Sequence, residues 1–347
     1  MTTFAAQLRD VNLQKTKMYR EQGMPKCAFI MLFAVLLAVF FQSCKKDAQI
    51  PEAIASIPMH LQVKRFDQRF AQATADSIPR LIKQFPYLFP EQYDAAFWQA
   101  KIEDTIQVAL NREVAKSFPD FEAQRADLET LFKHIEYYYP KTPLPTVVTV
   151  TSEVDYRNPV ILADTLLIVA LDNYLGSEHE FYGGIQKYLT QNFRKEQIDV
   201  AVASAFAEKI LGSRPRGRRF LDEMIFQGKR LYLMQHLLTL KDKAAVMGYT
   251  EEQWQWAQEN EVNIWTYFVE NELLFNTDGE LLNRFINPAP FSKFQMEFDR
   301  ESPPRLGRFI GWQMVNAYAE KKDIALQELM QLSTDEIFNN ATYKPRK

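Results

Sequence analysis

The four histidines are the first candidates for metal or acid–base chemistry in this chain of 347 residues. His60, His134, His179 and His236 are far apart, and none lies three or four residues from another. The pattern H-E-x-x-H, which places two zinc-binding imidazoles on one helix face, is therefore absent. A glutamate follows His179, but no second histidine does, and we interpret His179 as a turn residue. The sequence predicts no metal site and no cofactor.

Motifs for nucleophilic catalysis and nucleotide binding are absent as well. The serine elbow G-x-S-x-G, the Walker pattern and the dinucleotide pattern G-x-G-x-x-G do not occur. The 44 acidic residues would supply some carboxylate pair in any fold, so such pairs point to no particular reaction.

The two cysteines belong to an N-terminal export segment. Residues 27–41 read CAFIMLFAVLLAVFF and follow a basic stretch. This apolar run is shorter than a membrane-spanning helix requires. The stretch Phe41-Gln42-Ser43-Cys44 resembles a bacterial lipobox, in which the cysteine sulfur receives a diacylglycerol. We therefore predict a lipoprotein signal peptide over residues 1–43 and a lipid anchor at Cys44. The alternative is a plain signal-anchor helix with an incidental cysteine.

Export and lipidation limit the chemistry of the mature chain. Cys27 leaves with the signal peptide and Cys44 is acylated, so no disulfide, cysteine nucleophile or cysteine-ligated zinc remains. Residues 1–43 hold five of the 41 basic and two of the 44 acidic residues, which leaves 36 basic and 42 acidic residues. A net acidic chain outside the cytoplasm has no electrostatic footprint for nucleic acid. We expect the membrane, reached through the lipid, as one partner.

The elements that must position any site are mostly helices. Residues 60–66 alternate as a strand does, and residues 146–151 are β-branched throughout. We expect the apolar run 162–171 to be the hairpin partner of the second strand. Helical spacing of apolar residues predicts helices within 77–139 and over 195–211, 218–240, 250–275, 304–320 and 324–338. The predicted fold is α+β and mostly helical, with residues 44–58 as a polar tether and 59–347 as a single domain.

Two charged segments are candidate partner surfaces. The first is a loop between predicted helices, where Arg216, Arg218 and Arg219 could contact anionic headgroups or an acidic partner. The second is the triplet Glu-Asn-Glu at 259–261, which recurs at 270–272. Eleven residues are close to three helical turns, so Glu261 and Glu272 would share one helix face. The plainer interpretation of both segments is a solvated surface.

Several runs of the chain are long and unusual. They are Leu171-Asp172-Asn173-Tyr174-Leu175-Gly176, Arg219-Phe220-Leu221-Asp222-Glu223-Met224-Ile225, Ala289-Pro290-Phe291-Ser292-Lys293-Phe294, Glu301-Ser302-Pro303-Pro304-Arg305-Leu306-Gly307 and Gly311-Trp312-Gln313-Met314-Val315. These runs resemble the gliding-motility lipoprotein GldB family of Bacteroidetes, and the resemblance covers residue 60 to the end. Pro304 departs from the glycine expected before Arg305, which affects only a local turn.

The resemblance implies a degenerate relative of zincin-like metallopeptidases, with a small β-sheet and a large helical lobe. In such relatives one helix carries H-E-x-x-H, and a glutamate of a later E-G pair is the third ligand. The comparable positions here are Ser204, Ala205 and Glu208 on residues 197–211, and Gln227 before Gly228. Only Glu208 of these four can bind a cation well, so the resemblance implies a scaffold that has lost its metal.

Three functional hypotheses follow. The first is a non-enzymatic, lipid-anchored protein of the cell envelope that serves gliding motility through other motility or secretion proteins. The second is a residual zincin-like hydrolase or peptidase. The third is a periplasmic ligand-binding lipoprotein with Trp265, Tyr267 and Trp312 as cleft aromatics, although such aromatics more often belong to a core.

Overall fold

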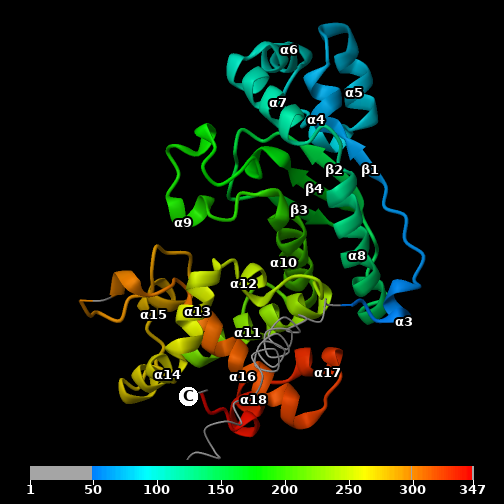
Figure 1. The fold of residues 1–347 in the computed structure, drawn as a ribbon. Coiled ribbons are helices and arrows are strands. Elements are labelled where there is room, and N and C mark those ends of the chain that lie inside the picture. Colours follow the sequence, from blue (N-terminus) through cyan, green and yellow to red (C-terminus); the bar gives the residue numbers. More distant parts are fainter. Residues whose placement is uncertain (1–48, 298, 346–347) are drawn as a thin grey trace, which may run out of the picture. The chain divides into compact units, whose positions relative to one another are not determined.

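A four-stranded mixed sheet lies in the N-terminal half of the described chain (Figure 1). The computed structural model describes residues 49–297 and 299–345, and Ile50–Lys347 form one unit. The predicted signal segment and Cys44 lie outside the described residues. The strand order is β1, β2, β4, β3, with β1–β2 and β2–β4 parallel and β3–β4 antiparallel. The strands are β1 (Val63–Arg65), β2 (Thr146–Val150), β3 (Val160–Ala163) and β4 (Leu166–Ala170).

The predicted hairpin between residues 146–151 and 162–171 is wrong, although the two segments do pair. The run 162–171 instead overlaps a hairpin of its own, because β3 and β4 are joined at Asp164 and Thr165. β4 then pairs with β2 in parallel, with Val148 opposite Ile168. A parallel pair cannot be joined by a tight turn, and residues 151–165, which include β3, make the longer connection.

Helices fill residues 77–139, as predicted. Aspartates begin two of them, since Asp94 accepts from the backbone N–H of Phe97, and Asp104 accepts from those of Ile106 and Gln107. These helices are α5 (Ile78–Gln84), α6 (Ala95–Glu103), α7 (Thr105–Ser117) and α8 (Glu122–Tyr138). A further helix, α4 (Phe66–Ala71), follows β1 directly.

The described part of the predicted tether contains a short helix, α3 (Glu52–Ala55). Ile54 is buried and α3 packs against α8. Lys133 Nζ of α8 donates to the carbonyl oxygen of Ala55 at 2.8 Å. The chain is thus attached to the folded unit from α3 onward.

Helices also make up most of the C-terminal half, and two predicted helices are divided. Residues 250–275 form two helices that meet at Asn260, and residues 324–338 form α17 and part of α18. The helices are α9 (Lys187–Thr190), α10 (Ile198–Leu211), α11 (Phe220–Leu237), α12 (Lys243–Met247), α13 (Glu251–Glu259), α14 (Glu261–Glu270), α15 (Glu280–Phe285), α16 (Leu306–Lys322), α17 (Leu326–Gln331) and α18 (Thr334–Ala341). With the four-stranded sheet, this helical content confirms the predicted α+β class.

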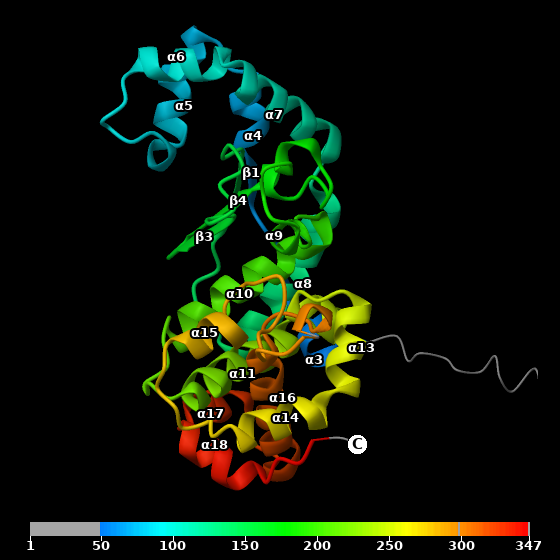
Figure 2. The same cartoon turned by 90° about the vertical axis from the view of Figure 1, so that its left-hand side faces the viewer.

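Two hydrophobic clusters cover the two faces of the sheet. Val147 and Leu167 point into the larger cluster, which includes residues of α8, α10, α11 and α16. Val148 and Val150 point into a smaller cluster with residues of α4 and α5, against which α6 also packs. The alternation along β2 therefore buries side chains on both faces. Figures 1 and 2 show α10 between the sheet and α11.

Two glycines allow α11 and α16 to pack with their backbones in near contact. A Cβ atom at Gly311 would lie 1.8 Å from the carbonyl oxygen of Met224 on α11. A Cβ atom at Gly228 would lie 2.3 Å from the carbonyl oxygen of Gly311. Backbone atoms leave no soft neighbour to move aside, so only glycine fits at either position while the helices keep this separation.

We predict that Gly311→Ala lowers the free energy of unfolding by about 2 kcal/mol or more, because the added methyl group must force the two helices apart. Gly279→Ala is the matched control, since a Cβ atom there meets nothing within 4 Å. This control should stay within about 0.5 kcal/mol of the wild type. Chemical denaturation of the purified protein measures both variants, and equal stability of Gly311→Ala and wild type would contradict the tight crossing.

The buried His134 and the half-buried His236 link the stability of the fold to pH. The Nδ1 atom of His134 on α8 lies 2.8 Å from the carbonyl oxygen of Thr130, and its Nε2 lies 3.0 Å from the hydroxyl of Thr239. These partners fit a neutral imidazole that donates from Nδ1 and accepts at Nε2. Burial lowers the pKa of His134, and burial likewise lowers the pKa of His236 on α11.

We predict that the neutral forms of His134 and His236 contribute to the free energy of unfolding. This contribution is fully present above the unfolded-state histidine pKa of about 6.5, and it is lost as the pH falls from there through the lowered pKa. The reason is that the unfolded chain binds protons in this window and the folded chain does not. Denaturation of wild type and His134→Gln at several pH values between about 7.5 and 5.5 measures the difference. The variant should show the shallower slope, and parallel curves would contradict the prediction.

Candidate functional site

A pocket of about 220 Å³ lies where α10, α11 and the beginning of α16 come together. The loop that follows β4 and the residue after α12 complete its wall. Its polar lining residues are Asn173, Asn192, Gln197, Ser204, Gln227, Arg230, Arg305 and Arg308. The pocket is therefore rich in guanidinium and amide groups.

Two of the four predicted vacated-site positions meet in this pocket. Ser204 on α10 and Gln227 on α11 both line it, although they are distant in sequence. Glu208, one helical turn after Ser204, does not line it and its side chain is about half exposed. Ala205 does not line it either. The helices α10 and α11 thus bring Ser204 and Gln227 to the same pocket.

Arg230 contacts two of the four vacated-site positions, Ser204 and Glu208. Its Nη2 atom donates to Ser204 Oγ at 3.1 Å and lies 3.6 Å from Glu208 Oε2. Gln227 Nε2 donates to Glu223 Oε1 at 2.8 Å, which holds the amide along α11. Within residues 49–297 and 299–345, no group of three His, Cys, Asp or Glu side chains is arranged to hold a metal ion. These residues do not fit a zinc site.

Arg305 and Arg308 are pocket residues that sequence reasoning missed. Arg305 Nη2 donates to the carbonyl oxygen of Gly248 at 3.1 Å, and Arg308 Nε donates to that of Ile286 at 2.6 Å. Burial lowers the pKa of both guanidiniums, that of Arg308 to about 9, and the like charges of Arg305 and Arg230 lower the latter further. The signal was present in the sequence, because Arg308 interrupts the otherwise apolar start of a helix three residues after Arg305.

The carbonyl oxygen of Gly248 orders one wall of the pocket. It accepts hydrogen bonds from Gln191 Nε2 at 2.9 Å, Asn192 Nδ2 at 3.1 Å and Arg305 Nη2 at 3.1 Å. Gly248 ends α12 in the left-handed region at φ 70°, and a Cβ atom there would lie 2.9 Å from Asn192 Nδ2. The glycine is needed for both reasons.

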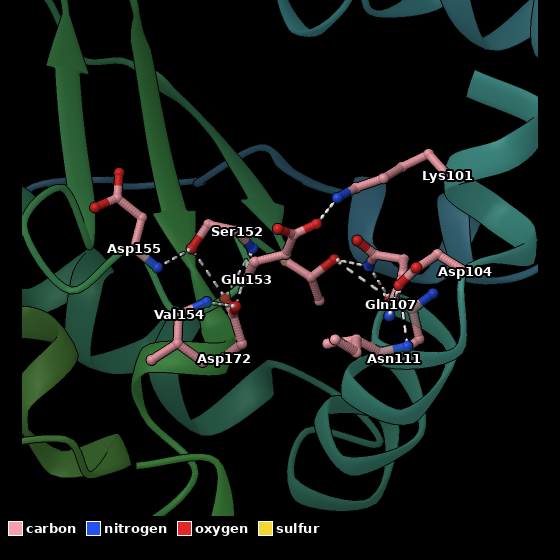
Figure 3. Close-up of polar contacts among 11 residues, drawn as sticks. Lys101, Asp104, Gln107, Asn111, Ser152, Glu153, Val154, Asp155 and Asp172 are labelled. Atoms are coloured by element: carbon pink, nitrogen blue, oxygen red, sulfur yellow. Dashed lines mark hydrogen bonds and ion pairs between the residues drawn. The ribbon is translucent and has the colours of Figure 1, made fainter. Parts of the chain in front are cut away.

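Another part of the wall comes from the run Leu171-Asp172-Asn173-Tyr174, of which Asn173 and Tyr174 line the pocket. Figure 3 shows the Asp172 carboxylate, which accepts from the backbone N–H groups of Ser152 at 3.0 Å and Val154 at 2.7 Å. Burial raises the pKa of Asp172, and these donors act against that rise. The carboxylate thereby fastens the loop after β2 to the end of β4.

Asn173, next in the chain, lines the pocket and is fully buried. Its Nδ2 atom donates to Ser152 Oγ at 3.3 Å, whereas its Oδ1 atom has no partner in the described part of the chain. Asn192 Oδ1 and the hydroxyl of Tyr174 are buried without a partner there as well. The walls of the pocket thus contain unsatisfied polar atoms beside its arginines.

The predicted partner surfaces are only partly exposed. Arg216 and Arg218 are exposed in the loop between α10 and α11. Arg219 is instead a structural residue, since it binds Asp222 at 2.8 Å and Asp335 at 2.9 Å, and these partners raise its pKa. Its assignment to the partner surface is therefore corrected.

The acidic repeat does not form one exposed face. Glu261 is 4% exposed and accepts from the hydroxyl of Tyr343 at 2.7 Å, so its predicted surface role is wrong. The physical reason is the division at Asn260, which starts α14 at Glu261 and turns that side chain inward. Glu272 follows the end of α14 and is exposed.

The aromatic residues proposed for a ligand cleft do not line the pocket. Trp312 is fully buried in the larger hydrophobic cluster, and Trp265 packs against that cluster. The hydroxyl of Tyr267 donates to the carbonyl oxygen of Phe294 at 2.7 Å. Trp312 therefore belongs to the core, and the half-buried Trp265 and Tyr267 pack against it.

The fold and the site define an α+β protein with an arginine-lined pocket beside its central helices. The chain belongs to the family of the gliding motility protein GldB, since the model of that lipoprotein family matches residues 47–345. This match confirms the family predicted from the quoted runs. No curated protein and no solved structure matches the chain significantly. Among the described residues, no helix has both the length and the apolar character that a membrane span requires.

Proposed function

We propose that this protein is a non-enzymatic, lipid-anchored component of the cell envelope that serves gliding motility through contacts with other envelope proteins. Membership of the GldB family supports the link with motility and the lipoprotein class. The lipobox-like stretch that ends at Cys44 supports anchoring by lipid, with the domain outside the cytoplasm.

The position of Arg230 is the observation on which the non-enzymatic role rests. A zincin needs two imidazoles, a carboxylate and a general base at one place. Here Ser204 and Glu208 flank a guanidinium, and Gln227 carries no charge. A cation placed among these side chains would be repelled by the arginine, and no imidazole would compensate for that repulsion. The scaffold is best explained as a zincin-like relative that no longer performs the hydrolysis.

A residual peptidase or hydrolase is the alternative enzymatic function, and it would need a catalytic group outside the four vacated positions. A ligand-binding lipoprotein is a second candidate, and the pocket itself favours it. Ligand binding and partner contact are compatible, because Arg216, Arg218 and Glu272 do not line this pocket. These three exposed residues are our candidates for the partner surface.

We predict that Cys44 carries the lipid, because the polar residues that follow it cannot hold a domain at a membrane. Growth with labelled palmitate should label the wild type and should not label Cys44→Ser. Cys27→Ser is the matched control, since Cys27 would be removed with the signal peptide and its substitution should leave labelling intact. Equal labelling of wild type and Cys44→Ser would exclude the lipid anchor.

We predict that function depends on the exposed charges and not on the carboxylate of the vacated site. In complementation of a deletion strain, scored as cell movement at equal protein level, Glu208→Gln should be silent. Combined Arg216→Glu, Arg218→Glu and Glu272→Lys should impair movement, with surface changes costing within about 0.5 kcal/mol of stability each.

The control for charge reversal is Arg80→Glu, because Arg80 is exposed on α5, away from these residues in sequence. It should be silent in the same assay. Loss of movement with Glu208→Gln at normal abundance, together with tolerated charge reversals, would contradict this prediction. It would indicate that function depends on the positions that correspond to the metal site of the metallopeptidases. Stoichiometric zinc in the purified protein would support the same conclusion.

A further inference from the structure

The pocket holds more positive charge than its neighbours balance. Arg230, Arg305 and Arg308 all line it, and the nearby carboxylates are Glu208 and Glu223. Glu208 pairs with Arg230 at 3.6 Å, and Glu223 accepts from Gln227. Arg305 and Arg308 form no ion pair with any carboxylate in the described residues. Two like charges thus lie partly buried without counter-ions of their own.

The guanidinium groups also have unused donors. Arg308 donates from Nε to a backbone carbonyl, and its two Nη atoms have no partner within the described chain. Arg305 uses one Nη atom on Gly248. A guanidinium presents five N–H donors in a planar fork that matches the oxygens of a carboxylate or phosphate. A buried, unpaired charge is costly, and protein structures ordinarily pair it.

We propose that this pocket binds a small oxyanion, a carboxylate or a phosphate, held by the guanidiniums of Arg305 and Arg308 with Arg230 at its side. The volume of about 220 Å³ is small for a ligand pocket, so the ligand is small. This binding would neutralise the mutual repulsion of the arginines and fill their free donor positions. The proposal does not depend on the non-enzymatic role proposed above.

The amide of Asn192 adds a further requirement on the ligand. Its Nδ2 atom faces the carbonyl oxygen of Gly248, which fixes the orientation of the amide, so its Oδ1 atom must be an acceptor. That oxygen is buried without a partner in the described part of the chain. A hydroxyl or amino group beside the anionic group would satisfy it. Phosphate esters of polyols or amino alcohols, and hydroxy- or amino-carboxylates, have this combination.

The test is binding of defined anions to the full chain purified in a non-ionic detergent. Inorganic phosphate, glycerol phosphate and citrate are compared with chloride at equal ionic strength, by calorimetry and by thermal unfolding. At least one of the three should bind saturably and raise the melting temperature, because a ligand that binds only the folded state stabilises it. The phosphate and citrate arms distinguish the two oxyanion classes.

Variants separate the pocket from general salt effects. Arg308→Gln should weaken binding by about ten- to a hundredfold, as expected for the loss of a charged hydrogen-bonding group. Arg308→Lys, which keeps the charge and loses the planar fork, provides a milder change if the glutamine variant does not fold. Arg112→Gln is the control, since Arg112 is an arginine with a side chain 76% exposed on α7, and binding should be unchanged.

Two results would overturn the proposal. One is the absence of saturable binding for all three anions. The other is equal binding by wild type, Arg308→Gln and Arg112→Gln, which would show that the anions act elsewhere on the surface. Arg308→Lys takes the place of Arg308→Gln in this comparison if the glutamine variant does not fold. The proposed partner-mediated role would survive either result, because its assay is movement of the cell and uses none of these arginines.

Discussion

The packing of α11 against α16 at Gly228 and Gly311 is the constraint on which the rest of the structure depends. The two helices touch backbone to backbone, so their relative position cannot adjust to side chains. That fixed contact places Gln227 and Arg230 of one helix beside Arg308 of the other. The arrangement of the pocket thus follows from a contact in which no side chain takes part.

The charge of the pocket is set by its arginines. Ser204 of α10 and Gln227 of α11 both line it, and neither side chain carries a charge. The guanidinium of Arg230 repels a cation and attracts an anion. The carboxylate of Glu208 is the ion-pair partner of this arginine.

Local patterns predicted the parts of the fold that depend on neighbours in sequence. Residues 146–151 are β-branched, and the apolar spacing in 77–139 is helical, so both were found. The parallel pairing of β2 with β4 was not predicted, because the apolar run 162–171 predicts one strand, whereas the turn at Asp164 and Thr165 divides it between β3 and β4. Glu261 was misplaced because its burial depends on Tyr343, far along the chain. Arg305 and Asn192 both donate to the carbonyl oxygen of Gly248, and residue spacing along the chain does not reveal such a tertiary arrangement.

The two hydrophobic clusters on either side of the sheet have a consequence for how the protein opens. Val147 of β2 belongs to the larger cluster, and Val148 and Val150 belong to the smaller one. The smaller cluster joins α4, α5 and α6 to the sheet without reaching α11 or α16. Regions with few buried contacts open at lower free energy than the rest of a protein. The layer α4–α6 can therefore exchange its amide hydrogens, or yield to a protease, while the arginine pocket remains folded.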